Sequence, residues 1–184
     1  CEPSCLSAIK EDAPDLLRGE EQRKARVIAK SAVLFEDFAA KLDLKLKSGP
    51  SEVVLHGHCH QKAMGLQPPA VALLSKIPGA KITALDSGCC GMAGSFGYEL
   101  GHYEVSRALA NRILLPGIES RPDATLAAPG FSCRSQVHGL AGLTARHPIE
   151  ILARQRRDAR RGIAECRRRV AENDHGLGDG LRHE

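Results

Sequence analysis

The stretch that decides the fold is Asp86-Ser87-Gly88-Cys89-Cys90-Gly91-Met92-Ala93-Gly94-Ser95-Phe96-Gly97. It contains two adjacent cysteines among four glycines. Adjacent cysteines can hardly form a disulfide with each other, because their Cα atoms lie ~3.8 Å apart across a trans peptide. They are better placed to direct two sulfur atoms at a shared ligand. Glycines such as Gly91 and Gly94 would let the backbone approach that ligand closely and adopt a positive φ.

The segments on either side of this stretch predict where it lies in the fold. Residues 80–85 form a short apolar run that is typical of a buried strand, and a helical pattern begins at about residue 99. The cysteine pair therefore lies on a loop between a strand and a helix, at the carboxyl end of the strand. Open α/β sheets bind their ligands at that end.

Two further strands are predicted, over residues 52–56 and 124–128, and each is followed by a cysteine. The intervening pattern predicts helices over residues 20–44, 68–76 and 99–115, from about residue 133, and from His147-Pro148 onward. The helix over residues 20–44 is expected to pack on the sheet. This order predicts an α/β fold, with Rossmann-like βα repeats forming a parallel sheet that has helices on both faces.

Four cysteines are predicted to meet at the carboxyl edge of this sheet. They are Cys59, Cys89, Cys90 and Cys133, in the spacing C-x29-C-C-x42-C, each on a loop directly after a strand. The loops that follow parallel strands share one edge, so these thiols should converge in space. We expect the apolar core not to involve them. His56 is interpreted as a cap of its strand rather than a ligand.

An iron–sulfur cluster is the first ligand that four converging thiols indicate, because thiolates hold such clusters and glycine-rich loops donate N–H groups to the sulfurs. Zinc is the second, although structural zinc sites usually use short C-x2–4-C spacings, and no C-x-x-C is present. A thiol hydrolase with Cys59 between His58 and His60 is a third alternative. Nucleotide binding is disfavoured, because the glycines do not follow G-x-G-x-x-G and no P-loop lysine follows them.

The composition bounds the remaining possibilities. The 184 residues with 42% hydrophobic content suffice for one domain with an appendage. The net charge of +4 comes largely from arginines in residues 154–169. The sequence therefore does not predict a basic domain that binds nucleic acid. Seven cysteines without a secretory leader favour metal binding in the cytoplasm over a disulfide framework. The first residue is Cys1 rather than Met, which suggests a piece of something longer.

Three longer motifs resemble a known family. They are His56-Gly57-His58-Cys59-His60-Gln61-Lys62, Gly88-Cys89-Cys90-Gly91-Met92-Ala93-Gly94-Ser95-Phe96-Gly97-Tyr98-Glu99 and Gly130-Phe131-Ser132-Cys133-Arg134. They look like the cysteine-rich CCG domain of heterodisulfide reductases, of the glycolate oxidase and anaerobic glycerol-3-phosphate dehydrogenase iron–sulfur subunits, and of the C-terminal part of FAD-linked D-2-hydroxyacid dehydrogenases. The resemblance covers about residues 2–153.

The resemblance implies a ligand set and a domain division. Cys59, Cys89, Cys90 and Cys133 would be ligands of a cluster of the 4Fe-4S type, and Cys5 would be the last ligand of a preceding repeat. Residues 1–18 would then be the end of that truncated repeat, 19–153 the CCG domain, and 154–184 an arginine-rich helix with a polar tail. The family pattern ends in C-x-x-C, whereas this chain has Gln136 at the last position.

The function that the resemblance implies is electron transfer. The chain would be the iron–sulfur part of a flavin-linked oxidoreductase that acts on a 2-hydroxy acid of the lactate, glycolate or 2-hydroxyglutarate type. FAD would lie in a flavin oxidase domain or subunit outside this sequence, and electrons would pass to a downstream acceptor, through which the enzyme could associate peripherally with a membrane. The alternative is a zinc-stapled structural or interaction domain without redox activity.

Overall fold

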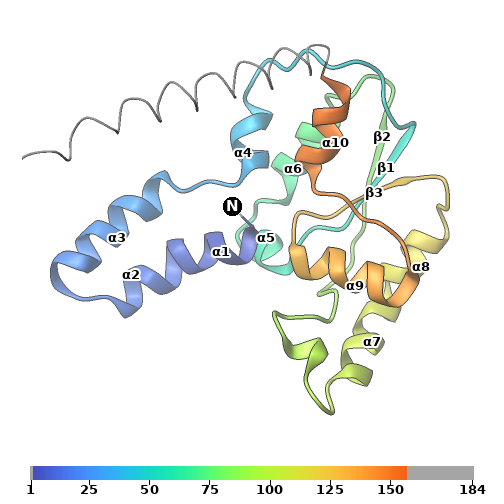
Figure 1. The fold of residues 1–184 in the computed structure, drawn as a ribbon. Coiled ribbons are helices and arrows are strands. Elements are labelled where there is room, and N and C mark those ends of the chain that lie inside the picture. The colour runs from blue at the N-terminus through green and yellow to red at the C-terminus, as the bar shows by residue number, and fades with distance from the viewer. Residues whose placement is uncertain (1, 157–184) are drawn as a thin grey trace, which may run out of the picture.

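A small parallel sheet surrounded by helices forms the body of the computed structural model, which describes residues 2–156 (Figure 1). Strands β1 (Glu52–Leu55), β2 (Lys81–Ala84) and β3 (Thr125–Ala127) lie in the order β2-β1-β3. Both outer strands pair with β1 in parallel. The predicted strands and their parallel arrangement are confirmed and are compatible with an α/β fold, whereas the Rossmann-like repeats remain a prediction.

Helices precede, connect and follow the strands. Among the described residues they are α1 (Pro3–Ser7), a π-helical segment (Ala8–Asp12), α2 (Ala13–Leu16), α3 (Gly19–Ser31), α4 (Phe35–Ala40), α5 (Cys59–Ala63), α6 (Gln67–Leu74), a 3-10 turn (Phe96–Tyr98), α7 (Tyr103–Arg112), α8 (Leu114–Glu119), α9 (Phe131–Ala141) and α10 (Pro148–Gln155). None of these helices is long and apolar enough to cross a membrane.

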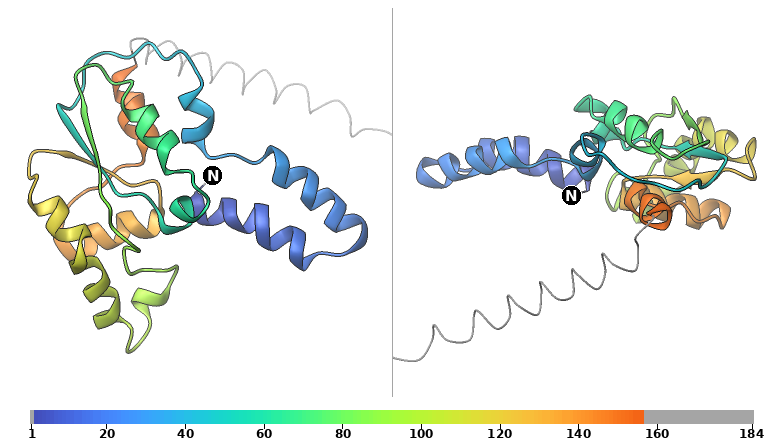
Figure 2. Two further views of the ribbon diagram at one scale, coloured as in Figure 1. Left: turned by 180° about the vertical axis from the view of Figure 1, so that it is seen from behind. Right: turned by 90° about the horizontal axis from the view of Figure 1, so that it is seen from above.

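Helices α1 to α3 form an arm that projects from the sheet (Figures 1 and 2). The prediction of one helix over residues 20–44 packed on the sheet is therefore wrong. Helix α3 ends at Ser31, the chain passes through Leu34 in an extended conformation, and α4 begins at Phe35. Val27 and Ile28 of α3 remain 68% and 56% exposed. Apolar spacing of three and four residues continues across the break, so the pattern alone could not reveal it.

Pro14 and Pro116 lie inside helical segments rather than ending them. Pro14 follows the π-helical segment and lies in the first turn of α2. Pro116 is the third residue of α8, so the helix predicted over residues 99–115 is instead divided at Ile113, where φ is −142°. Proline is tolerated in a first turn because its missing N–H would have no partner there.

Apolar side chains are buried on both faces of the sheet. Val53 and Leu55 of β1 belong to one core cluster with residues of α4, α6 and α10. Val54 points the opposite way and belongs to a second cluster with residues of α8 and α9. The second cluster also contains Cys90 and Cys133, so the expectation that the core excludes these cysteines is wrong. A buried thiol packs as a small hydrophobic group.

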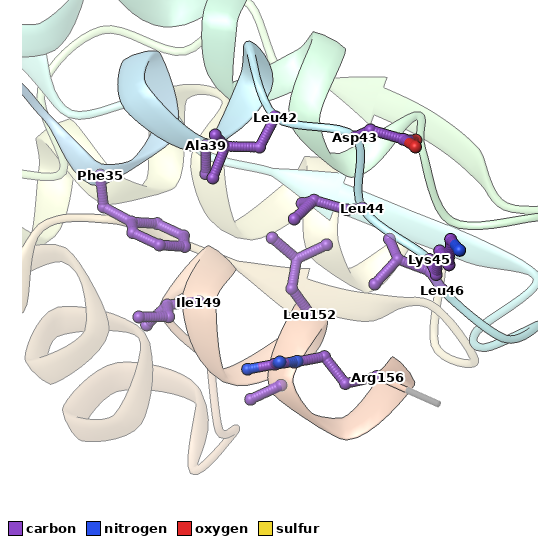
Figure 3. Close-up of a pocket in the computed structure, with 11 residues that line it drawn as sticks. Phe35, Ala39, Leu42, Asp43, Leu44, Lys45, Leu46, Ile149, Leu152 and Arg156 are labelled. Carbon is purple, nitrogen blue, oxygen red and sulfur yellow. The ribbon is translucent and has the colours of Figure 1, made fainter. Parts of the chain in front are cut away.

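A cavity of about 600 Å³ lies beside the first cluster, away from the cysteines. Residues of α4, of the segment after it and of α10 line it, with Phe35, Leu44 and Leu152 pointing into it (Figure 3). No cysteine lines this cavity. The fold therefore separates its apolar cavity from its thiol groups.

The last described helix begins where the sequence predicts. His147 caps α10: its ring accepts a hydrogen bond from Ile149, and Glu150 accepts one from the His147 backbone. The predicted arginine-rich helix and polar tail lie almost wholly in residues 157–184, outside the described residues, as do Cys1 and Cys166.

Glu36 supplies the first testable prediction. Its carboxylate is fully buried, both oxygens lack hydrogen bonds, His147 Nε2 lies 3.6 Å from Oε1, and burial raises the pKa of Glu36. A raised pKa means that the folded state binds the proton more tightly, so Glu36 destabilises the fold increasingly as pH rises through that pKa. Glu36→Gln should therefore raise the free energy of unfolding at pH 7 by about 1 kcal/mol.

The measurement is urea unfolding at pH 7 and pH 4, with the exposed Glu119→Gln as the matched control. The gain from Glu36→Gln should shrink at pH 4, because the wild-type carboxyl is then largely protonated in the folded state. A gain of equal size at both pH values would contradict the charge-burial explanation.

Candidate metal centre

The four predicted cysteines follow the three parallel strands, but only two of them lie on a loop. Cys59 is the first residue of α5, after β1, and Cys133 lies in the first turn of α9, after β3. Only Cys89 and Cys90, after β2, lie on a loop, which corrects the prediction for the other two. The helix begins early at Cys59 because the ring of His58 accepts a hydrogen bond from the His60 N–H and so caps α5.

The four thiols form one continuous group, which we call the cysteine cluster. Neighbouring sulfurs in this group affect one another's pKa values, Cys59 with Cys89, Cys89 with Cys90, and Cys90 with Cys133. Cys90 and Cys133 are buried, whereas Cys59 and Cys89 are half-buried. All four are free thiols. The structure thus brings together residues that are up to 74 positions apart in the sequence.

The four sulfurs shift one another's pKa values in opposite directions. A hydrogen bond from Cys59, helped by one from Cys90, holds the pKa of Cys89 well below its usual range. A hydrogen bond from Cys90 lowers the pKa of Cys133 to about 5, although burial opposes this. The same contacts, with burial, raise the pKa values of Cys59 and Cys90. The thiolate is the form that binds a metal, so the cluster is partly prepared for one.

His56 also faces the cysteine cluster. It directly follows β1, is 3% exposed, and its Nδ1 lies 2.7 Å from the Ser87 hydroxyl. A ring nitrogen of His56 and the sulfur atoms of Cys90 and Cys133 lie within 4.8 Å of one another. The sequence interpretation of His56 as a strand cap overlooked this. The available signal was its position, directly after a strand at the same edge as the cysteines.

Two glycines let the loops of the site approach each other. A Cβ atom on Gly130 would lie 2.2 Å from the His58 ring and 3.1 Å from the Cys133 sulfur. A Cβ atom on Gly91 would lie 2.2 Å from the backbone oxygen of Ser106. Gly91 also has φ +100° and donates its N–H to the Cys89 sulfur at 3.3 Å. Both positions therefore require glycine for close contact.

Gln136 occupies the position at which the resembled family has a further cysteine. It is buried, and its Nε2 donates to the backbone oxygen of Cys90 at 2.9 Å and to the hydroxyl of Ser106 at 2.8 Å. The amide thus ties α9 to the cysteine loop and to α7. These hydrogen bonds hold the backbone of Cys90 in place.

A lysine supplies positive charge beside the cysteine loop. Lys62 of α5 donates a hydrogen bond from Nζ to the backbone oxygen of Ser87. Burial lowers its pKa, whereas Asp86, Cys133 and Cys59 act in the opposite direction. A cation at this place offsets part of the repulsion between neighbouring thiolates. Sequence reasoning did not single out Lys62 for a role, because nothing in the local pattern indicates its contact with the loop.

The N-terminal segment lies beside the site without contributing a buried sulfur. Helix α1 contacts α5, and the Ser7 hydroxyl lies 2.6 Å from Nδ1 of His60 (Figure 1). Cys5 is exposed. Its assignment to a preceding repeat stays a prediction.

The residues present fit a thiolate-bound metal group. They supply four gathered sulfur donors, two of them with lowered pKa values, and a buried imidazole nitrogen of His56 with no hydrogen-bond partner. Soft sulfur donors favour zinc and iron–sulfur clusters over magnesium or calcium. The arrangement can therefore hold a metal, and the donor set alone leaves both alternatives open.

Comparisons with known proteins point to oxidoreductases. The chain is 30% identical over 151 residues to a subunit of the anaerobic glycerol-3-phosphate dehydrogenase of Escherichia coli K12, an alignment that covers 82% of this chain and 38% of that protein. It is 35% identical over 97 residues to D-2-hydroxyglutarate dehydrogenase of the same organism, covering 52% of this chain and 10% of that protein. The corresponding enzyme of Pantoea ananatis is 40% identical over 74 residues, which are 40% of this chain and 7% of that enzyme.

These relatives are dehydrogenases or dehydrogenase subunits, which agrees with the resemblance to the cysteine-rich part of FAD-linked dehydrogenases. The chain spans well under half the length of each. No family model matches the chain, and no solved structure matches it. The similarity therefore supports an oxidoreductase context, within which the role of the site is open.

The opposite pKa shifts of Cys59 and Cys89 predict which of the two reacts first. In the metal-free, reduced chain, Cys89 should be alkylated by iodoacetamide at pH 6.5 ahead of Cys59, because the lowered pKa of Cys89 keeps it a thiolate and the raised pKa of Cys59 keeps it a thiol. Both side chains are half-buried, so access is similar. Peptide mass spectrometry over time gives the order. Rapid modification of Cys59 alone would instead support the thiol hydrolase.

Gly91 and Gly94 of the cysteine loop should differ in their tolerance of a side chain. Gly91 and Gly94 both have positive φ, but only at Gly91 would a Cβ meet neighbouring atoms. Gly94→Ala should cost about 1 kcal/mol of stability from backbone strain, and Gly91→Ala should cost more and reduce metal retention. Thermal unfolding and metal analysis of both variants test this. Equal effects would show that the close contact with Ser106 has no importance.

Proposed function

We propose that this chain is the iron–sulfur electron-transfer module of a flavin-linked oxidoreductase that acts on a 2-hydroxy acid. The observation that carries the proposal is the convergence of Cys59, Cys89, Cys90 and Cys133 after three parallel strands. The similarity to dehydrogenases supports the redox context. The D-2-hydroxyglutarate dehydrogenase relatives support the substrate class of lactate, glycolate or 2-hydroxyglutarate type.

The cysteine cluster would hold the iron–sulfur group, which we propose to be of the 4Fe-4S type. When bound, such a group supplies one-electron redox chemistry between a flavin and a downstream acceptor. Cys90 and Cys133 provide the buried donors, and Cys59 and Cys89 the half-exposed ones. The N–H of Gly91 donates to the Cys89 sulfur, a contact of the kind that tunes cluster potentials.

The remaining parts of the proposal concern what lies outside this sequence. FAD and the substrate site would belong to a flavin oxidase domain or subunit. Residues 1–18 would end a preceding CCG repeat, with Cys5 as its last ligand, and residues 19–153 would be the CCG domain. We propose a cytoplasmic location, with any membrane association made through the acceptor.

Anaerobic purification with iron, sulfide and zinc analysis tests the proposal. The expected result is iron and acid-labile sulfide in the wild-type protein, with broad absorption near ~400 nm. Cys90→Ser and Cys133→Ser should each reduce the iron content by more than half, whereas the exposed Cys5→Ser should reduce it less. Zinc without sulfide, and no visible absorption, would overturn the proposal in favour of a zinc-stapled domain.

Because Cys90 and Cys133 also pack in the second core cluster, each serine variant needs a folding control. Circular dichroism melting of the metal-free proteins provides it. A variant that melts cooperatively and has lost iron reports on ligation, whereas one without a cooperative transition reports on packing. Iron loss confined to variants of the second kind would count against the assigned ligands.

A further inference from the structure

His56 has one ring nitrogen that the protein leaves without a partner. The imidazole is 3% exposed, and its Nδ1 lies 2.7 Å from the hydroxyl of Ser87, whereas Nε2 has no hydrogen bond of standard geometry, although the ring lies within reach of Cys133. A buried polar atom without a partner destabilises the fold, so it needs a reason to be there. The Nε2 atom is thus available to something bound at the site.

Two sulfur atoms that are metal ligands by type lie close to this imidazole. A His56 ring nitrogen, Cys90 Sγ and Cys133 Sγ lie within 4.8 Å of one another. Ligands of one tetrahedral ion, at about 2.0–2.3 Å from it, lie roughly 3.5 Å apart. A small contraction of these buried side chains would therefore bring all three onto one metal atom.

The neighbouring polar side chains make hydrogen bonds to other groups. Gln136 donates to Cys90 and Ser106, and Nδ1 of His58 accepts from the His60 N–H to cap α5. His60 is exposed, and its Nδ1 lies 2.6 Å from the Ser7 hydroxyl. Among the histidines around the site in the described residues, only His56 combines burial, proximity to two sulfurs and an unpartnered ring nitrogen.

We propose that His56 Nε2, Cys90 Sγ and Cys133 Sγ bind one metal atom together, so that the ligand set is mixed imidazole and thiolate. The inference rests on the proposed function for the identity of that metal, an iron atom of the cluster. Cys59 and Cys89 form the thiolate-only part of the set. In this arrangement Nδ1–H would donate to the Ser87 hydroxyl, which leaves the Nε2 lone pair free for the metal.

A neutral imidazole in place of a thiolate changes the charge of the centre. Each thiolate brings one negative charge and imidazole brings none. Where histidines replace cysteines on one iron of a cluster, the reduction potential is higher than with thiolates alone. We therefore expect the potential of the loaded wild-type protein to lie above that of His56→Cys.

Cobalt alone is the first probe. Co²⁺ is titrated into the reduced, metal-free chain, and the absorption of the bound cobalt is followed. The titration is done for wild type, His56→Ala, Ser87→Ala and His138→Ala. His138 is an exposed residue of α9, so its variant serves as the control. Loss of an outer hydrogen-bond partner typically weakens metal binding ~10–100-fold. Ser87→Ala should fall in that range, His56→Ala should exceed ~100-fold, and His138→Ala should change nothing.

Pulsed electron paramagnetic resonance of the iron-loaded, reduced wild-type protein is the second probe and needs no variant. Labelling histidine with nitrogen-15 should change the coupling of a nitrogen bound directly to the centre. Two results together would overturn the inference: no such coupling, and a loss of cobalt affinity of no more than ~100-fold in His56→Ala. His56 would then be a hydrogen-bond donor to Cys133. If the purified protein contains no iron or sulfide but the variants show the expected order of cobalt affinities, the proposed function fails and the mixed ligand set stands.

Discussion

The structure depends on the parallel pairing of β1 with both β2 and β3. Strand β1 lies between β2 and β3. The chain after β1 therefore emerges between the chain segments that follow β2 and β3. The His56 N–H continues the pairing by donating to the Ala127 oxygen at 2.9 Å. The residues that follow the strands are therefore held at one edge by main-chain hydrogen bonds. The strand register therefore sets the positions of the residues that form the site.

Close backbone approach is the second requirement, and it explains why small residues and buried thiols occur together. Gly130 lets the segment before α9 contact the His58 ring, and Gly91 lets the cysteine loop contact the backbone of α7 at Ser106. Gln136 then joins these two elements through Cys90 and Ser106. The same packing makes Cys90 and Cys133 members of the second core cluster. The metal centre and the core are thus continuous on this face of the sheet, whereas the first core cluster contains no cysteine.

Gathering thiols has an electrostatic cost that the protein meets in several ways. Shared protons pair Cys59 with Cys89 and Cys90 with Cys133, so the four groups need not all be charged without metal. The Lys62 amine donates a hydrogen bond to the backbone oxygen of Ser87, on the loop that carries the cysteine pair. A bound metal would replace these protons and take up the negative charge of the thiolates. Metal binding and proton release are therefore coupled at this site.

The sequence by itself determined the three strands, the start of the last helix and the cysteines that follow the strands. Apolar runs, prolines and glycines act over a few residues, so they can be interpreted locally. It could not show that residues 20–44 divide into an arm helix and a body helix, because the apolar spacing continues across the break. Only the tertiary structure showed that His56 contacts Ser87 and that Gln136 contacts Cys90. Their contacts depend on strand register and helix packing between segments 31 to 46 residues apart, and no local pattern encodes such contacts.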